Sequence, residues 1–244
     1  MHPLKKLVFT IFLLVQVSVV FSQGKNSKIA NLRSFDERPL HFGFLIGINA
    51  MDFRVYNTGV PVNVDGELLY ADVIDLSPGL NIGIVSSYKL TNDLNLRFLP
   101  GISFGQRNMS YIRYNNAGDE IGERETFKIK STYLEFPLLL KYNAFRMHNA
   151  KPYLVGGFNV RYDLAKDKQD KLLLNSLDGY LEFGAGFDFY LTYFRLSVEA
   201  KMSIGLADML NPDGTGEPIE ADYEYTKALD KLNSRIFCLT FYFE

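Results

Sequence analysis

The sequence is poor in cysteine and tryptophan and has no excess of positive charge, and these absences narrow its possible functions. Cys238 is the single cysteine among 244 residues, so no disulfide within the chain can stabilise the fold. Lys and Arg total 26 while Asp and Glu total 28. A nucleic-acid partner normally requires a basic surface, so we expect none here.

Long apolar runs are also scarce. The run Leu7–Phe21 follows Lys5 and Lys6 and ends beside Ser22, an arrangement typical of a secretory signal peptide. We predict a signal peptide over residues 1–22; an uncleaved membrane anchor is the alternative, which the shortness of the run disfavours. No second run is long enough for a membrane helix, so strands would have to carry any membrane role.

Strict alternation is the clearest pattern present. In Tyr193–Leu206 (YFRLSVEAKMSIGL), apolar residues occupy every second position, with small or charged residues between them. Successive side chains of a strand point to opposite faces, so this segment is predicted to be a strand with one apolar face. That face would pack into the core of a soluble sandwich, or would contact lipid in an outer-membrane barrel.

Seven further segments are predicted strands: His41–Phe53, Gly79–Leu90, Leu94–Tyr111, Thr126–Tyr142, Lys151–Asp163, Tyr180–Leu191 and Arg235–Phe243. Short turns alternate with four long polar connections: Arg54–Pro78, Ile112–Glu125, Leu164–Gly179 and Ala207–Ser234. This rhythm is typical of barrels with both termini in the periplasm. We predict an all-β protein, an eight-stranded antiparallel transmembrane outer-membrane β-barrel over residues 40–244, preceded by a periplasmic segment over residues 23–39.

The predicted inward positions carry charges of both signs. An eight-stranded barrel is only wide enough for its own side chains, and buried charges need partners. We therefore predict a charge network that fills the lumen, with solute or proton conduction as the alternative. Its predicted members are Arg97, Arg107, Glu135, Lys141, Glu182, Asp188, Arg195, Glu199 and Lys201.

Two prolines interrupt predicted strands. Proline cannot donate a ladder hydrogen bond and is confined to strand edges and bulges. Pro100 and Pro137 lie at similar heights on neighbouring strands, so we predict a pair of strand bulges there. A weak seam where a partner docks is the alternative.

Catalytic and metal-binding patterns are lacking. A barrel lipase needs a nucleophile with a histidine base near the outer leaflet. Beyond the predicted signal peptide only His41 and His148 remain, both near the predicted periplasmic end. We expect no enzyme activity, no catalytic residue, no metal or cofactor, and no small-molecule substrate.

Several segments resemble one known family. Phe35-Asp36 is followed by HFGFLIGINAMDF (His41–Phe53), LRFLPGISFGQR (Leu96–Arg107), YLEFPLLLKY (Tyr133–Tyr142) and KPYLVGG (Lys151–Gly157). Together these resemble the PorT family of outer-membrane barrels, with one departure, because Glu244 follows Phe243 where such chains often end in an aromatic residue.

The resemblance implies a non-catalytic component required for export by the type IX secretion system, which also supports gliding motility in some bacteria. Expected partners are outer-membrane lipid and other components of that system. The alternative is a structural or adhesive small barrel that displays its extracellular loops.

Overall fold

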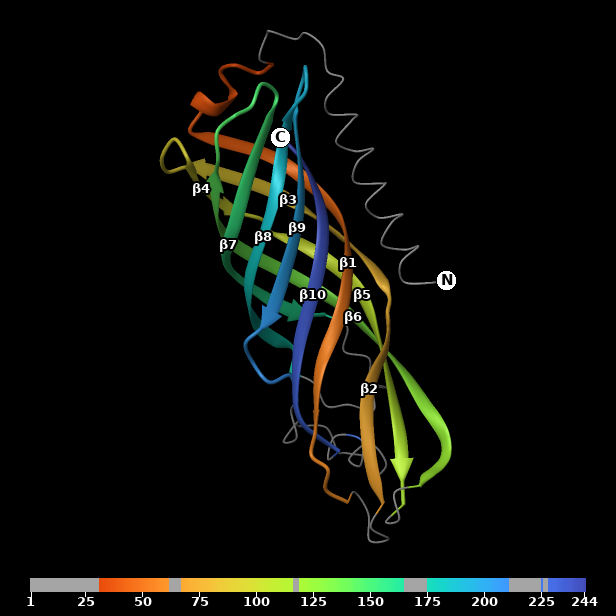
Figure 1. Cartoon of the computed structure of the whole chain (residues 1–244). Helices are drawn as coiled ribbons and strands as arrows, with labels where there is room; N and C mark the ends of the chain where they lie inside the picture. The colour runs from red at the N-terminus through yellow and green to blue at the C-terminus, as the bar shows by residue number, and fades with distance from the viewer. Residues whose placement is uncertain (1–30, 62–66, 116–118, 165–174, 211–224, 226–227) are drawn as a thin grey trace, which may run out of the picture.

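The chain folds into one antiparallel sheet that closes on itself as a ring of tilted strands (Figure 1). The computed structural model describes residues 31–61, 67–115, 119–164, 175–210, 225 and 228–244, so the predicted signal peptide lies outside the described residues. In these ranges no helix has both the length and the apolar character needed to cross a membrane.

A short 3-10 helix, η1 (Phe35–Glu37), precedes the strands. The strands are β1 (Leu40–Asn57), β2 (Leu68–Leu76), β3 (Pro78–Lys89), β4 (Leu94–Phe98), β5 (Gly101–Tyr114), β6 (Glu120–Asn143), β7 (Ala150–Asp163), β8 (Leu177–Tyr190), β9 (Arg195–Gly205) and β10 (Leu229–Phe243). β1 closes the ring by pairing with β10 on one side and β3 on the other.

Two pairs of these strands follow one another almost without a break. Ser77 alone separates β2 from β3, and Leu99 and Pro100 separate β4 from β5. If each pair is counted once, the strands of the described residues form a ring of eight consecutive antiparallel strands. The prediction of an all-β antiparallel sheet closing as a barrel is confirmed.

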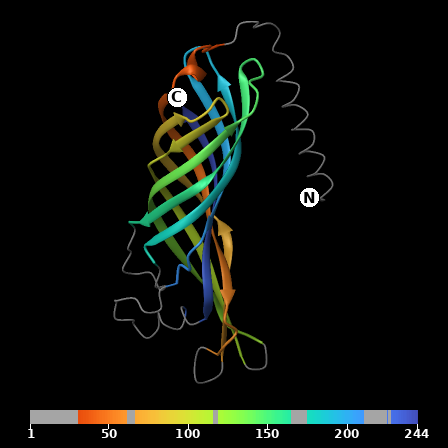
Figure 2. The same cartoon turned by 90° about the vertical axis from the view of Figure 1, so that its left-hand side faces the viewer.

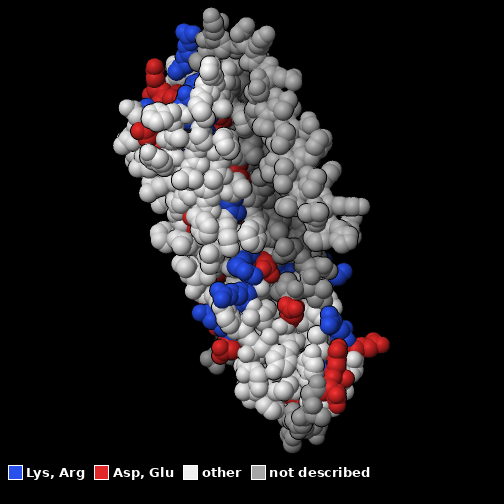
Figure 3. All heavy atoms as spheres, in the orientation of Figure 1, with Lys and Arg blue, Asp and Glu red and all other residues white. Residues whose placement is uncertain are grey.

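The outer wall carries a belt of apolar side chains. On the face shown in Figure 3, charged residues gather near the top and over the lower half, and they are sparse in the zone between. Alternation along each strand places these apolar residues outward, where they are 42–65% exposed. An exposed apolar surface of this extent indicates contact with lipid; examples are Phe42, Ile84, Leu138, Leu154, Phe158, Phe183 and Phe237.

The predicted bulges at Pro100 and Pro137 are corrected by the strand registers. β3 and β6 each keep one register on both sides of Pro100, and the β6–β7 register runs unchanged through Pro137. The Ile84 amide donates to the Pro100 carbonyl at 2.9 Å, and the Leu99 amide donates to the Pro137 carbonyl at 3.1 Å. The carbonyls of Pro100 and Pro137 therefore still accept hydrogen bonds from the neighbouring strands. The break between β4 and β5 contains no inserted residue, as a bulge would require.

All four predicted long loops are partly strand, which is a second correction. β2 lies inside the predicted loop Arg54–Pro78, β5 and β6 extend into Ile112–Glu125, and β10 begins inside Ala207–Ser234. β8 begins at Leu177, inside the remaining loop Leu164–Gly179. β2, β5, β6 and β10 continue beyond the point where β7, β8 and β9 stop, and they form a projecting end opposite the chain's C-terminus (Figures 1 and 2). The opposite end, with the short connections, is called the turn end below.

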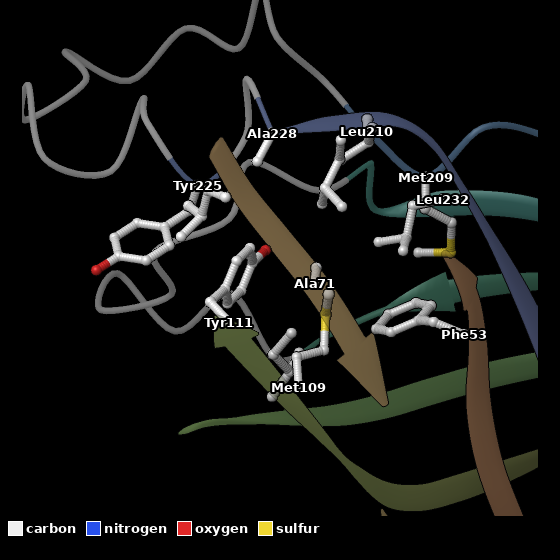
Figure 4. Packing of buried hydrophobic residues seen from close by; sticks show 12 residues of the cluster. Phe53, Ala71, Met109, Tyr111, Met209, Leu210, Tyr225, Ala228 and Leu232 are labelled. Carbon is white, nitrogen blue, oxygen red and sulfur yellow. The ribbon is translucent and has the colours of Figure 1, made fainter. Parts of the chain in front are cut away.

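The projecting end has an apolar core of its own (Figure 4). Phe53, Met109, Tyr111 and Leu232 are almost fully buried there and come from β1, β5 and β10. The rings of Tyr111 and Tyr225 meet edge to face, with centroids 5.0 Å apart. This packing explains why the chain stays in strands after it has left the apolar belt, since the extended strands bury a second hydrophobic cluster.

Substitution of two adjacent glycines of β7, Gly156 and Gly157, tests how closely the strands of the wall pack. A Cβ on Gly157 would lie 2.2 Å from the Leu138 carbonyl oxygen, whereas one on Gly156 would meet nothing closer than 3.8 Å. We expect Gly157→Ala to lower the free energy of unfolding by about 1–3 kcal/mol, because a backbone clash cannot be relieved by rotating a side chain. Urea unfolding in detergent, followed by heat-modifiable gel mobility, measures this.

Gly156→Ala is the matched control and should change the free energy of unfolding by less than about 0.5 kcal/mol. Equal stability of the two variants would contradict the close approach of β6 and β7 at Gly157.

Candidate functional site: the charged interior of the barrel

The interior of the barrel is lined by polar and charged side chains from strands all around the ring. Alternation places them inward, opposite the apolar belt. The structure puts all nine predicted network residues inside the barrel, and eight of them are buried, while Glu135 is half-buried. They are Arg97, Arg107, Glu135, Lys141, Glu182, Asp188, Arg195, Glu199 and Lys201.

Arg97 lies at the centre of a group near the turn end. Its guanidinium contacts Glu199 at 3.2 Å and Glu244 at 3.3 Å, and all three side chains are fully buried. Tyr242 covers the guanidinium at 4.1 Å and donates its hydroxyl to the second Glu199 oxygen at 2.6 Å. One arginine is thus held between two carboxylates and an aromatic ring.

Asp188 joins a second cation to the same group. It accepts from the Lys141 ammonium at 2.7 Å and from the Ser197 hydroxyl at 2.6 Å. Arg195 lies 3.7 Å from Asp188 and also pairs with Glu244. The network near the turn end is therefore continuous, with each carboxylate contacting a cation and each cation contacting a carboxylate.

Glu182 organises a separate group farther along the lumen. One of its oxygens pairs with Arg161 at 3.0 Å, and the other pairs with Lys201 at 2.6 Å. Asn159 and Ser203 each donate to the first oxygen at 2.8 Å. The buried carboxylate is therefore stabilised by two cations and two neutral donors.

Arg107 lies apart from both groups, toward the projecting end. It donates to the hydroxyls of Ser131 at 2.9 Å, Tyr133 at 3.1 Å and Ser234 at 2.8 Å, and it stacks on Phe53 at 4.2 Å. Within the described residues no ion pair joins it to a carboxylate. The structure thus brings eight of the nine predicted residues into ion pairs and places Arg107 in a ring of hydroxyls.

Two central members of the network were missed by the sequence prediction. Arg161 is fully buried and bridges Glu135 and Glu182, at 3.0 Å each. It alternates with Phe158, Val160 and Tyr162, so the same periodicity that identified the other residues also indicates an inward arginine. Glu244 continues the alternation past Phe243, and its side chain enters the lumen instead of ending the chain in solvent.

The segment before β1 packs across the turn end of the lumen. Asp36 accepts from the Tyr190 hydroxyl at 2.8 Å, and Lys151 lies 3.7 Å from the same carboxylate. Phe35 stacks on His41 with centroids 4.2 Å apart, and His41 is buried. His41 therefore serves to hold this segment against the barrel.

One cavity among the described residues of the interior is small. A cavity bounded by Asn81, Glu135, Lys201 and Tyr242 has a volume of about 20 Å³, which is roughly room for one water molecule. In the part of the chain that the structure describes, no group of His, Cys, Asp and Glu is arranged to hold a metal ion. The lumen is a packed polar core.

Comparison with known protein families finds one match that covers most of the chain. A family model described as an outer membrane protein beta-barrel domain matches residues 21–211. Ail, the attachment invasion locus protein of Yersinia pestis, solved with the heparin analogue sucrose octasulfate, is 13% identical over 83% of this chain and 96% of its own, with a TM-score of 0.36.

OprG from Pseudomonas aeruginosa is 14% identical over 84% of this chain and 90% of its own, with a TM-score of 0.34. The comparison with curated proteins found no match.

Removal of the Glu182 charge tests the interior network. We expect Glu182→Gln to lower the free energy of unfolding by about 3–5 kcal/mol, because it weakens the pairing of Arg161 and leaves Lys201 without its carboxylate. Adding Lys201→Met should recover part of this loss, since the uncompensated ammonium is then gone. The measurement is urea unfolding in detergent.

The control is Glu123→Gln on the exposed outer part of β6, which should leave stability nearly unchanged. Additive losses in the double variant would show that the ion pair does not couple the two positions.

Proposed function

The chain belongs to the outer membrane protein beta-barrel domain family, and on that premise we propose a non-catalytic outer-membrane barrel that acts through its projecting end. The one observation that carries this proposal is the second hydrophobic core, which lies beyond the apolar belt. The strands around it present a folded surface to the space outside the membrane.

The filled interior supports a binding role over transport. Arg97, Lys141, Arg161 and Lys201 are buried together with the carboxylates that neutralise them. Moving a solute through this region would separate several buried ion pairs, each costly to break. Neither His41 nor His148 lies at the projecting end, which also favours a barrel without enzymatic activity.

The orientation that we propose places the turn end in the periplasm. Barrels of this kind have short periplasmic turns and longer extracellular segments. β3 and β4 are joined by four residues, Leu90–Asp93, whereas β1, β5 and β6 extend far beyond the belt. The segment containing Asp36 would then close the periplasmic side, and the core around Phe53 would close the extracellular side.

Display of this surface for attachment, to another cell or to an extracellular matrix, is the function that the geometry supports best. On the outer faces of β2 and β5, Tyr70 and Tyr114 form an edge-to-face pair 5.6 Å apart, and Tyr70 is 38% exposed. Aromatic residues of this kind are frequent energetic centres of binding surfaces.

A role in type IX secretion is the second candidate. It is favoured by the resemblance of Leu96–Arg107 and Tyr133–Tyr142 to the PorT family. In that case the partners would be other components of the secretion machinery, contacted from the turn end or through the membrane wall.

The attachment and secretion functions can both be tested in a deletion strain that lacks this barrel and is complemented with variants. We expect Tyr70→Ser combined with Tyr114→Ser to reduce cell attachment to the level of the deletion strain, because the aromatic pair on the outer face is lost while the barrel still inserts. Tyr193→Ser, at a 90% exposed tyrosine of the turn end, is the matched control and should attach normally. Heat-modifiable mobility verifies insertion of each variant.

Fractionation of a type IX cargo protein in the same strains separates the two candidates. Display predicts normal export in the deletion strain. Accumulation of cargo in the periplasm, restored by the wild type and by the double tyrosine variant alike, would replace the display proposal with the secretion role.

A further inference from the structure

The outward row of β6 changes character sharply along its length. From the turn end it runs through Tyr142, Leu140, Leu138, Phe136 and Leu134, all part of the apolar belt. Thr132 follows, and then two exposed lysines, Lys130 and Lys128. The change from wholly apolar to basic takes place within one or two repeats of the pleat.

The height of these lysines matches the edge of the membrane. Lys130 lies twelve positions along β6 from Tyr142, which is a rise of about 31 Å along the membrane normal for a strand tilted by ~40°. The apolar band of such barrels is about 25 Å tall. The Lys130 and Lys128 ammonium groups therefore lie at the level of the lipid headgroups.

On β6 itself no acidic residue shares this stretch of the outward row; Asp75 of β2 lies opposite Asn108, two strands away from Lys128. Between Leu134 and Arg124 the outward row is Thr132, Lys130, Lys128 and Thr126, while Glu125 and Glu135 occupy inward positions. Within the described residues neither lysine forms an ion pair. Two positive charges are left together without a neutralising neighbour on their own strand.

The strand beside them offers neutral donors. Gln106 of β5 lies opposite Lys130, and Asn108 lies opposite Lys128. The Gln106 amide donates to Asn108 at 2.8 Å, and Asn108 donates to Ser77 at 3.1 Å. On its other side β6 pairs with β7 only as far as Tyr133, so the lysines lie beyond the last paired residue.

We propose that this patch of Lys128, Lys130, Gln106 and Asn108 binds the phosphate groups of a phosphorylated glycolipid of the outer leaflet. Lysine ammonium groups bind phosphate as point charges, and amides add hydrogen-bond donors. The acyl chains of the same lipid would lie on Leu134 and Phe136 below. The proposal rests on the proposed orientation, which puts this end of β6 in the outer leaflet.

The test uses the full barrel in detergent micelles and measures adducts with bis-phosphorylated lipid A by native mass spectrometry. We expect Lys128→Ser combined with Lys130→Ser to lower the affinity about 10- to 30-fold, because each surface lysine contributes similarly to anionic lipid binding. The corresponding double Lys→Arg variant should retain binding. Lys231→Ser, which removes a cation farther from the belt on β10, should also retain it.

Removing the phosphates from the lipid should have the same effect as removing the lysines from the protein. The affinity of the wild type for dephosphorylated lipid A should therefore be as low as the affinity of the double Ser variant for bis-phosphorylated lipid A. Equal binding of the two lipids to wild type, or unchanged binding by the folded Ser variant, would overturn the proposal. Displacement of lipid A by an equal concentration of inorganic phosphate would also overturn it, since the site would then be one for free anions.

Labelling of Gly122→Cys in intact cells with an impermeant maleimide tests the orientation separately. If the Gly122→Cys variant is labelled at the cell surface but the barrel does not distinguish phosphorylated from dephosphorylated lipid A, the lipid site is rejected and the proposed function is not. Absence of surface labelling would reject the proposed function, whatever the lipid result.

Discussion

Neutralisation of charge inside a narrow barrel is the constraint on which the rest of this structure depends. Lipid surrounds the wall, so each inward cation must find its carboxylate or another strong acceptor within the lumen. Glu182 neutralises Arg161 and Lys201, and Arg97 is neutralised by Glu199 and Glu244. Arg97 of β4 pairs across the ring with Glu199 of β9, whereas Glu182 of β8 pairs with cations of the two neighbouring strands. The polar interior therefore acts as the core of the protein.

The same constraint separates the two ends. At the turn end the charged group around Asp188 continues into contacts with the segment that contains Asp36. Toward the projecting end the charges give way to the hydroxyls around Arg107 and then to the apolar cluster around Phe53. A filled lumen leaves the outer surfaces as the places where this protein can meet partners.

Strand periodicity made the fold and much of the interior predictable. Where a strand crosses lipid, as in Tyr193–Leu206, each position is either apolar or inward, and the alternation is unambiguous. The ends of β1 and β5 and the whole of β2 lie beyond the belt and surround a second core, so their pattern no longer follows the lipid and they resemble loops. The same alternation predicts that Arg161 points inward. The hydroxyl partners of Arg107 could not be predicted in this way, because they depend on which strands meet across the lumen.

Ion conductance across a planar lipid bilayer tests the central claim most directly. Wild-type barrel, inserted at measured density, should produce no steady conductance above that of the bare bilayer, because paired side chains fill the lumen. Discrete and reproducible conductance steps from the wild type would show an open path through the charged interior and would contradict this account.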